Sequence, residues 1–193
     1  MIQRFTFGHP LPTDSVVRSL PAASGPVPCL TPAPEGGWAY TMAADAIVYG
    51  LGEMPRGINK RGWHYVANNT DEAHHGECKL SYYGAHNFLL IDGGKGQPCF
   101  GVFVDFPGKV YYDIGYTTYD RLHFYTDGPD YDLYFITGAD LNDISRQFRE
   151  LVGRSYIPPK WAFGLQQSRW GYKTAEDIRE VARQYHENGL PLD

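Results

Sequence analysis

Hydrophobic and polar residues alternate through the middle of the chain, between about residue 88 and residue 136. The segment 100–106 predicts a strand with one strongly apolar face, because its alternate positions are Phe100, Val102, Val104 and Phe106. Other short β-prone runs are separated by turn-forming residues, and they cover 38–42, 47–51, 88–91, 110–119, 122–125 and 131–136. Strands spaced this closely, with no helix between them, predict a mainly antiparallel β-sandwich.

The hydrophobic period changes to that of a helix after residue 139. Asp140 and Asp143 form a D-x-x-D helix start, in which the first acid caps backbone N–H groups. The apolar stripe that follows consists of Leu141, Ile144, Phe148, Leu151 and Val152. We therefore predict a helix over about 141–152.

A second change of pattern occurs near the end of the chain. The apolar run Trp161–Leu165, framed by prolines and polar residues, predicts a buried strand. Thr174 and Asp177 then form another helix start, and the stripe that follows is Ile178, Val181, Ala182 and Tyr185. Gly189 is placed to end this helix with a left-handed cap, before the approach to a second strand at Leu192. One parallel strand with one helix cannot close a sheet, so we expect a chain that is cut.

These patterns predict two domains, 1–155 and 156–193, with Pro158-Pro159 just beyond the boundary. Residues 1–37 are rich in Pro, Ser and Thr and predict mostly loop, including 20–34, although Phe5 and Phe7 suit one face of an edge strand.

The segment 57–77 has little apolar periodicity and many Asn, Asp, His and Gly residues. We predict a long loop there. Long loops inside compact domains are more often functional than accidental.

Composition narrows the function classes. The 193 residues carry a formal net charge of -5 with scattered Lys and Arg, so we expect no nucleic-acid partner. No apolar run approaches the roughly 18 residues of a transmembrane helix, and Met1–Phe5 lacks the apolar centre of a signal peptide. The three irregularly spaced cysteines, Cys29, Cys78 and Cys99, fit reduced thiols in a cytoplasm. We therefore expect a cytoplasmic protein with no membrane partner.

A specific resemblance begins at the prolines. The run P-x-W-A-F-G-x-x-Q-S-R-W-G-Y at 159–172, followed by a helix and L-P-L-D, resembles the first barrel strand and helix of glycoside hydrolase family 31. That family contains retaining α-glucosidases and α-xylosidases. Three further stretches agree in the expected order: Val48–Glu53, Asn69-Thr70-Asp71 and Arg149–Arg154. The resemblance covers roughly 39–193 and is greatest to an intracellular bacterial α-glucosidase.

The resemblance implies a mainly β fold, in which an N-terminal antiparallel β-sandwich of galactose-mutarotase type precedes the first β/α unit of a truncated (β/α)8 barrel. It implies the N-terminal portion of a retaining α-glucosidase that removes terminal α-linked glucose from oligosaccharides. It implies no cofactor. In the family the catalytic acid pair lies on later barrel strands, so we expect no catalytic residue in this chain and no activity from the chain alone.

Asn69-Thr70-Asp71 is the best candidate site in the sandwich. A carboxylate held by its neighbours can accept two sugar hydroxyls at once, which fixes the orientation of a ring. Local sequence alone favours an Asx-turn. The resemblance instead implies that Asp71 lies on a loop that reaches over the barrel mouth to bind substrate.

Trp170 is the second candidate. It follows the predicted barrel strand at its C-terminal end, where barrel active sites form. An indole there either packs against the apolar face of a pyranose or shields the barrel top. The resemblance places an aromatic residue in the subsite of the cleaved glucose, so we expect Trp170 to be a substrate wall.

Other motifs build no site. His74-His75-x-x-Cys78 lacks the spacing of a zinc site and a second ligand pair, so we expect no metal. Gly93–Gly96 lacks the setting of a phosphate loop, and Ser168 has no partnered His and Asp. Two alternatives remain, a stand-alone carbohydrate-binding β-sandwich and part of an α-xylosidase. The sequence also leaves open the preferred linkage and whether the full-length protein forms a homo-oligomer.

Overall fold

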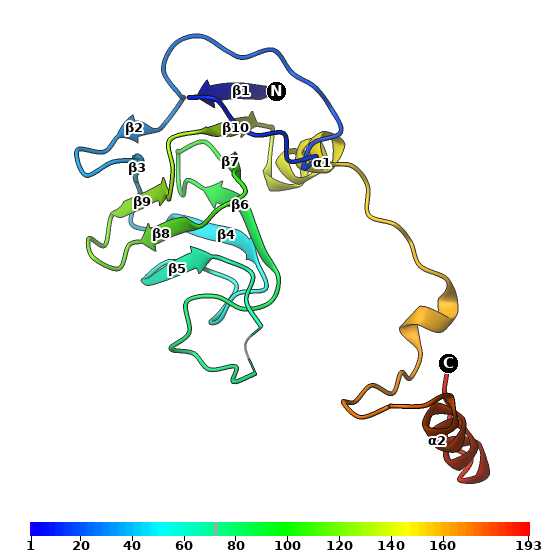
Figure 1. The fold of residues 1–193 in the computed structure, drawn as a ribbon. Helices are drawn as coiled ribbons and strands as arrows, with labels where there is room; N and C mark the ends of the chain where they lie inside the picture. The colour runs from blue at the N-terminus through cyan, green and yellow to red at the C-terminus, as the bar shows by residue number, and fades with distance from the viewer. Residues whose placement is uncertain (72) are drawn as a thin grey trace. The chain divides into compact units, whose positions relative to one another are not determined.

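A computed structural model of the chain describes residues 1–71 and 73–193. The chain divides into two compact units, Met1–Arg154 and Ser155–Asp193 (Figure 1). Among the helices in the described ranges, none combines the length and hydropathy that crossing a membrane requires.

Two five-stranded sheets make up most of the first unit and confirm the predicted antiparallel β-sandwich (Figure 1). Sheet A has the strand order β1-β10-β7-β6-β4, and sheet B has the order β2-β3-β9-β8-β5. The strands are β1 Ile2–Phe7, β2 Thr31–Pro32, β3 Trp38–Thr41, β4 Ile47–Gly52, β5 Trp63–Ala67, β6 Ala85–Asp92, β7 Phe100–Asp105, β8 Val110–Ile114, β9 Arg121–Thr126 and β10 Tyr131–Thr137.

The core lies between the inner faces of the two sheets. Its largest fully buried side chains include Tyr65, Phe100, Phe124, Phe135, Leu51, Leu89, Ile91, Ile114, Leu122 and Leu133. Burying a large apolar side chain stabilises the fold by roughly 1.5–3 kcal/mol. Alternate positions from both sheets therefore supply one core, as the period of two in the sequence predicts.

Helix α1, Leu141–Val152, packs against sheet A, as predicted for 141–152. The Phe148 ring stacks on Phe88 at 3.8 Å between centroids and meets Phe103 edge-on at 5.4 Å. The helix therefore covers the second face of β7, and all six residues of that strand are buried. The alternation in the sequence showed only the face that Phe100 shares with the sandwich core.

Strand β5 corrects the prediction that 57–77 is one long loop. Tyr65 and Ala67 are buried while His64 and Val66 are half-buried, which is the alternation of a strand with one covered face. β5 pairs only with β8, at the edge of sheet B. Five residues between polar loops are too short a run for periodicity to stand out, and pairing with β8 decides their conformation.

Other boundaries differ less. β8 ends at Ile114 and not near residue 119, because Gly115 turns the chain with a φ of 70°. The two-residue β2 lies inside the predicted loop 20–34. The expected edge strand at the N-terminus is confirmed, and Phe5 of β1 is buried in the core.

The second unit contains the predicted helix. α2 covers Ala175–Glu187, and the Thr174 hydroxyl accepts from the Asp177 amide at 3.2 Å. The Asp177 carboxylate accepts in return from the Thr174 amide at 2.8 Å, which completes a capping box. Gly189 follows the helix with a φ of 64°. Both predicted end signals are therefore confirmed.

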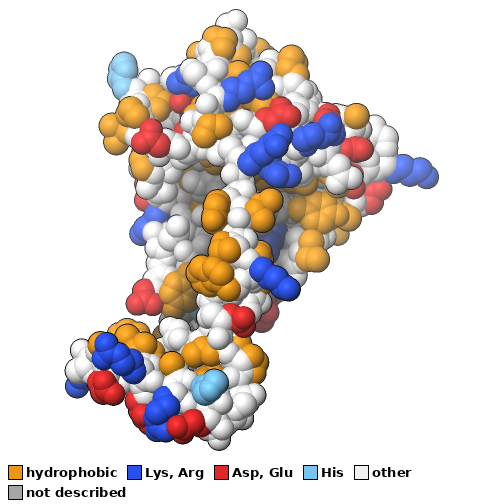
Figure 2. Space-filling view, turned by 90° about the vertical axis from the view of Figure 1, so that its right-hand side faces the viewer, with side chains coloured by type: hydrophobic (Ala, Val, Ile, Leu, Met, Phe, Trp, Pro, Cys, Tyr) orange, Lys and Arg blue, Asp and Glu red, His pale blue; other side chains and the backbone are white. Residues whose placement is uncertain are grey.

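The buried strand predicted at Trp161–Leu165 is wrong for this structure. Residues Lys160–Phe163 form a short 3-10 helix, η1, and Trp161 and Phe163 are 60% and 72% exposed. Hydrophobic side chains accordingly lie at the surface of this unit (Figure 2). A parallel strand forms its backbone hydrogen bonds with neighbouring strands. The second unit offers few such partners to this segment. Leu165 and Asp193 meet where the two predicted strands would begin to pair, through Asp193 N to Leu165 O at 3.0 Å.

Candidate functional site

β4 contains a distorted turn, and the residue after it bonds to the end of the loop that carries Asp71. Gly50, Leu51 and Gly52 have positive φ angles of 114°, 67° and 73°, and the pairing of β4 with β6 shifts between the two glycines. A Cβ at Gly50 would lie 2.1 Å from the Phe88 carbonyl oxygen, so the close approach of the two strands requires glycine there. After this bulge, the Glu53 amide donates to the Gly84 carbonyl at 2.7 Å.

The Asp71 loop, residues 68–84, joins β5 to β6 and folds back on itself. Its two arms are connected by the Thr70 amide, which donates to the Tyr82 carbonyl at 3.2 Å, and by the Ser81 hydroxyl, which donates to the Asn68 carbonyl at 2.6 Å. Just before the loop, the Val66 amide donates to the Leu80 carbonyl at 2.9 Å. The described part of the loop is therefore a hydrogen-bonded extension of the sandwich.

Asn69 and Asp71 both bond to the returning arm. Asn69 Oδ1 accepts from the Ala85 amide at 2.6 Å, a contact between residues 16 positions apart, so this side chain connects distant segments. Asp71 Oδ1 accepts from the Tyr83 hydroxyl at 3.1 Å, and both residues are exposed. A carboxylate has about four lone-pair sites on two oxygens. Asp71 is thus held in place and keeps capacity for further hydroxyl donors.

The tip of the loop adds aromatic contacts. The His75 ring lies 4.8 Å from Tyr82 and 5.4 Å from Tyr83, measured between centroids. The Tyr82 hydroxyl donates to the Gly76 carbonyl at 2.9 Å. Among the described residues, no group of three or more His, Cys, Asp or Glu side chains is arranged to hold a metal ion.

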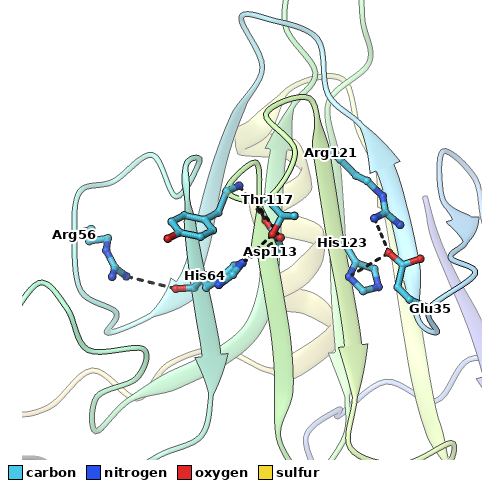
Figure 3. Close-up of polar contacts among 8 residues, drawn as sticks. Glu35, Arg56, His64, Asp113, Thr117, Arg121 and His123 are labelled. Carbon is cyan, nitrogen blue, oxygen red and sulfur yellow. Dashed lines mark hydrogen bonds and ion pairs between the residues drawn. The ribbon is translucent and has the colours of Figure 1, made fainter.

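Basic residues at the base of the loop were not predicted as part of the site. The Arg56 guanidinium donates to the His64 carbonyl at 3.4 Å (Figure 3). It also donates to the Lys79 carbonyl at 3.4 Å and stacks over Trp63 at 4.1 Å. Arg56 therefore connects β5 to the returning arm. The only sequence signal was the cluster of Arg and Lys at 56–61.

Lys60 lies at the same base and is only 6% exposed. Burial lowers the pKa of its ammonium group, the nearby Arg56 charge lowers it further, and Glu77 opposes both. Its Nζ lies 5.7 Å from the centre of the Tyr65 ring. Lys60 and Arg56 thus place two basic side chains around Tyr65, in the strand from which the Asp71 loop leaves.

Trp170 belongs to the second unit and is 97% exposed. Arg169 Nε donates to its carbonyl at 3.2 Å, and the Arg169 guanidinium lies 6.0 Å from the centre of the Tyr172 ring. Asp71 and Trp170 therefore belong to different units, and the substrate-binding role of each remains a prediction.

Comparison with protein families gives matches in both units. Residues 33–113 match the glycosyl hydrolase 31 N-terminal galactose mutarotase-like domain, and residues 155–193 match the glycosyl hydrolases family 31 TIM-barrel domain. The chain belongs to glycoside hydrolase family 31. The resemblance carried by the sequence motifs is therefore confirmed, and so is the mainly β architecture followed by the start of a barrel domain.

Several family 31 proteins are similar to this chain. Alpha-glucosidase 2 of Bacillus thermoamyloliquefaciens is 34% identical over 75% of this chain and 18% of its own length. Alpha-xylosidase XylQ of Lactiplantibacillus pentosus is 31% identical over 65% of this chain and 15% of its own length. The structure of a family 31 dextranase of Flavobacterium johnsoniae complexed with glucose matches with a TM-score of 0.72 and 25% identity, over 86% of this chain and 20% of that one. The chain thus spans about a fifth of the length of these relatives.

Proposed function

We propose that this chain is the substrate-loop portion of a retaining α-glucosidase that removes terminal α-linked glucose from oligosaccharides. The observation that supports the proposal best is the exposed Asp71 carboxylate, held by Tyr83 on a loop closed by hydrogen bonds. Similarity to an alpha-glucosidase over three quarters of the chain supports the substrate class. Family membership supports the reaction class, glycoside hydrolysis.

In this proposal Asp71 orients the sugar and does not break the bond. Its carboxylate accepts two hydroxyls of one ring, and such charge-assisted hydrogen bonds are roughly twice as strong as neutral ones. Trp170 packs against the apolar face of a substrate sugar as a wall. Retention requires two carboxyl groups about 5 Å apart, one as nucleophile and one as acid/base. We place that pair outside these 193 residues.

An α-xylosidase is a second candidate, because an alpha-xylosidase is among the similar proteins. Xylose lacks the hydroxymethyl group of glucose, so the two activities differ in how tightly a wall such as Trp170 closes around that position. A stand-alone carbohydrate-binding sandwich is less well supported, since a finished binding module has no use for the exposed apolar residues of the second unit. A cytoplasmic location also remains a proposal, supported by three cysteines that form no disulfide.

The first test is the purified 193-residue chain with an aryl α-glucoside. We expect no hydrolysis above a mock purification. Turnover that survives both Asp71→Ala and Trp170→Ala would show that the active site has been placed wrongly.

The second test uses the full-length protein that carries this chain. Steady-state kinetics on maltose, isomaltose and an α-xyloside compare Asp71→Ala with Asp120→Ala, a matched exposed aspartate in the β8–β9 turn. Loss of a charged hydrogen bond costs about 1.5–3 kcal/mol, so kcat/KM should fall about ten- to a hundred-fold for Asp71→Ala only. An unchanged kcat/KM on all three substrates would make the loop merely structural.

Trp170→Ala separates a wall from a support. A wall shapes the pocket without taking part in bond cleavage, so this change should alter the ratio of kcat/KM among the three substrates. One common factor on all three would contradict the specificity role and leave Trp170 as a support of the barrel top.

A further inference from the structure

A polar pocket lies on the outer face of sheet B, away from Asp71. Neighbouring strands present His64 of β5, Asp113 of β8 and His123 of β9 side by side, because these residues are paired in register (Figure 3). The pocket beside them has a volume of about 180 Å³ and is lined by Glu35, Asp113, Thr117, Thr118, Arg121 and His123. None of these residues belongs to the Asp71 loop.

The polar groups of this pocket are fixed in position. Asp113 accepts from the Tyr116 and Thr117 amides at 2.9 and 3.2 Å, and its carboxylate lies 3.1 Å from His64 Nε2. Burial alone would raise the pKa of Asp113, but hydrogen bonds from Thr117, the two amides and His64 lower it overall, so the carboxylate is ionised at neutral pH. A rigid acceptor set needs little ordering when a ligand binds.

Opposite Asp113, the Glu35 carboxylate pairs with Arg121 at 2.5 Å and lies 4.0 Å from His123 Nδ1 (Figure 3). His123 Nε2 lies 2.7 Å from the Gly36 carbonyl. The pocket therefore combines two carboxylates, one guanidinium, two threonine hydroxyls and an imidazole. Charges of both signs lie close together, which disfavours a strongly anionic or cationic ligand. Mixed donors and acceptors suit a neutral ligand with many hydroxyls.

A row of partly exposed aromatic rings continues from the pocket. The His123 ring stacks with Tyr125 at 5.5 Å between centroids, and Tyr125 stacks with Tyr111 at 4.8 Å with an interplanar angle of 11°. Tyr125 is 42% exposed. A row of rings beside clustered hydrogen-bonding groups offers an apolar face and polar edges together, and a sugar ring has the complementary pair of surfaces.

Topology separates this pocket from the Asp71 loop. β5 pairs with β8 so that Trp63 faces Ile114 and Ala67 faces Val110. The loop leaves β5 after Ala67, whereas the pocket adjoins the turn that follows Ile114. The loop and the pocket turn therefore leave opposite ends of the same pair of strands, while Arg56 connects the returning arm at Lys79 to the backbone of His64.

We propose that the outer face of sheet B is a second, non-catalytic binding site for a neutral oligosaccharide. One sugar ring packs against the exposed part of the Tyr125 ring, and the hydroxyls of its neighbour bond to Glu35, Asp113 and Arg121 in the pocket. The site holds oligosaccharide substrate to the protein and takes no part in bond cleavage. This inference rests on the proposed substrate class but not on the role proposed for Asp71.

In the test, the 193-residue chain is titrated with maltotriose, isomaltotriose and cellotriose. Binding is measured by calorimetry and by the NMR chemical shifts of residues in β8 and β9. We expect at least one trisaccharide to bind with a Kd of about 1 mM. Tyr125→Ala should weaken binding at least about tenfold, which corresponds to 1.4 kcal/mol. Glu35→Ala should also weaken it, whereas Tyr125→Phe should preserve it because the ring remains. Tyr156→Ala, which removes an exposed tyrosine of the second unit, is the matched control.

Three results would overturn the proposal. The first is absence of binding by all three sugars up to about 20 mM, where even a weak site is detected. The second is binding that Asp71→Ala abolishes and Tyr125→Ala does not, which would assign the sugar to the loop. The third is sedimentation that shows a dimer dissociated by Tyr125→Ala, which would make this face a contact between copies.

Discussion

Different interactions hold the sandwich and the second unit in their folded conformations. In the sandwich, Val48, Leu133 and Ile136 are fully buried, and β1 pairs with β10 across more than 100 positions of sequence, from Ile2 to Ile136. Neither η1 nor α2 contains a buried residue. A helix satisfies its backbone groups within its own segment, so the capping box suffices to define α2, while the strand expected beside it did not form.

The largest expected difference between the two units is in hydrogen exchange. Core-strand amides exchange only through global unfolding, whereas amides without a packed neighbour exchange with an opening free energy near zero. We expect the amides of Val102 and Val104 to be protected by several orders of magnitude more than those of Phe163 and Leu165. The measurement should be made at two protein concentrations, because the exposed apolar residues favour self-association. Equal protection in both segments would contradict the comparison.

Truncation of one apolar side chain in each unit gives the next largest effect. Leu133 is fully buried, so Leu133→Ala should lower the free energy of unfolding by about 2–5 kcal/mol. Phe163 is larger but 72% exposed, and Phe163→Ala should change the free energy of unfolding by no more than about 0.5 kcal/mol. Urea unfolding followed by tryptophan fluorescence measures both. A larger loss for Phe163→Ala would mean that the second unit has a core of its own.

The smallest effect concerns pH and α2. Hydrogen bonds from Arg183 and Gln184 lower the pKa of Glu180 from 4.5 to about 2, and those from Thr174 lower the pKa of Asp177. A carboxyl group with a depressed folded pKa stabilises the fold above its unfolded pKa, and this contribution is lost as pH falls. Helicity of α2, measured by residue-specific NMR shifts, should therefore decline as pH falls from about 4.5 toward 2.

Glu180→Gln should remove part of that decline. Glu176→Gln, which alters a longer ion pair with Arg179 at 3.4 Å, should remove less and is the control. An unchanged decline in Glu180→Gln would show that other groups control the pH dependence of the helix.

Much of the fold follows from local patterns. Residues 141–152 carry both a cap at Asp140 and a complete apolar stripe, and the structure has that helix. Residues 161–165 carry only an apolar run, and the conformation of such a run depends on neighbouring strands. The error at β5 was the opposite one, a strand where the sequence predicted a loop. Pairing with β8 makes these five residues a strand, and their own sequence between polar loops does not indicate it.

The sequence likewise predicts part of the candidate site. Asp71 could be singled out because a motif and a family resemblance coincide at one acid. Arg56 and the positive φ of Leu51 could not be, since their roles arise from contacts between segments that are far apart in sequence. Sequence therefore indicates which group meets a ligand more readily than which groups hold it in place.

The closure of the Asp71 loop separates the position of the acid from the shape of the loop tip, and evolution can change the two independently. The bonds of Asn69 to Ala85 and of Thr70 to Tyr82 fix the position of the acid from below. Residues 73–79 lie beyond these bonds, and doubling the length of a flexible segment costs only about 0.6 kcal/mol in closure entropy. Insertions and deletions there can reshape the rim around a bound sugar while the group that orients it stays where it is. The tip of this loop is accordingly the place to graft variable sequence in a library that selects for new linkage preferences.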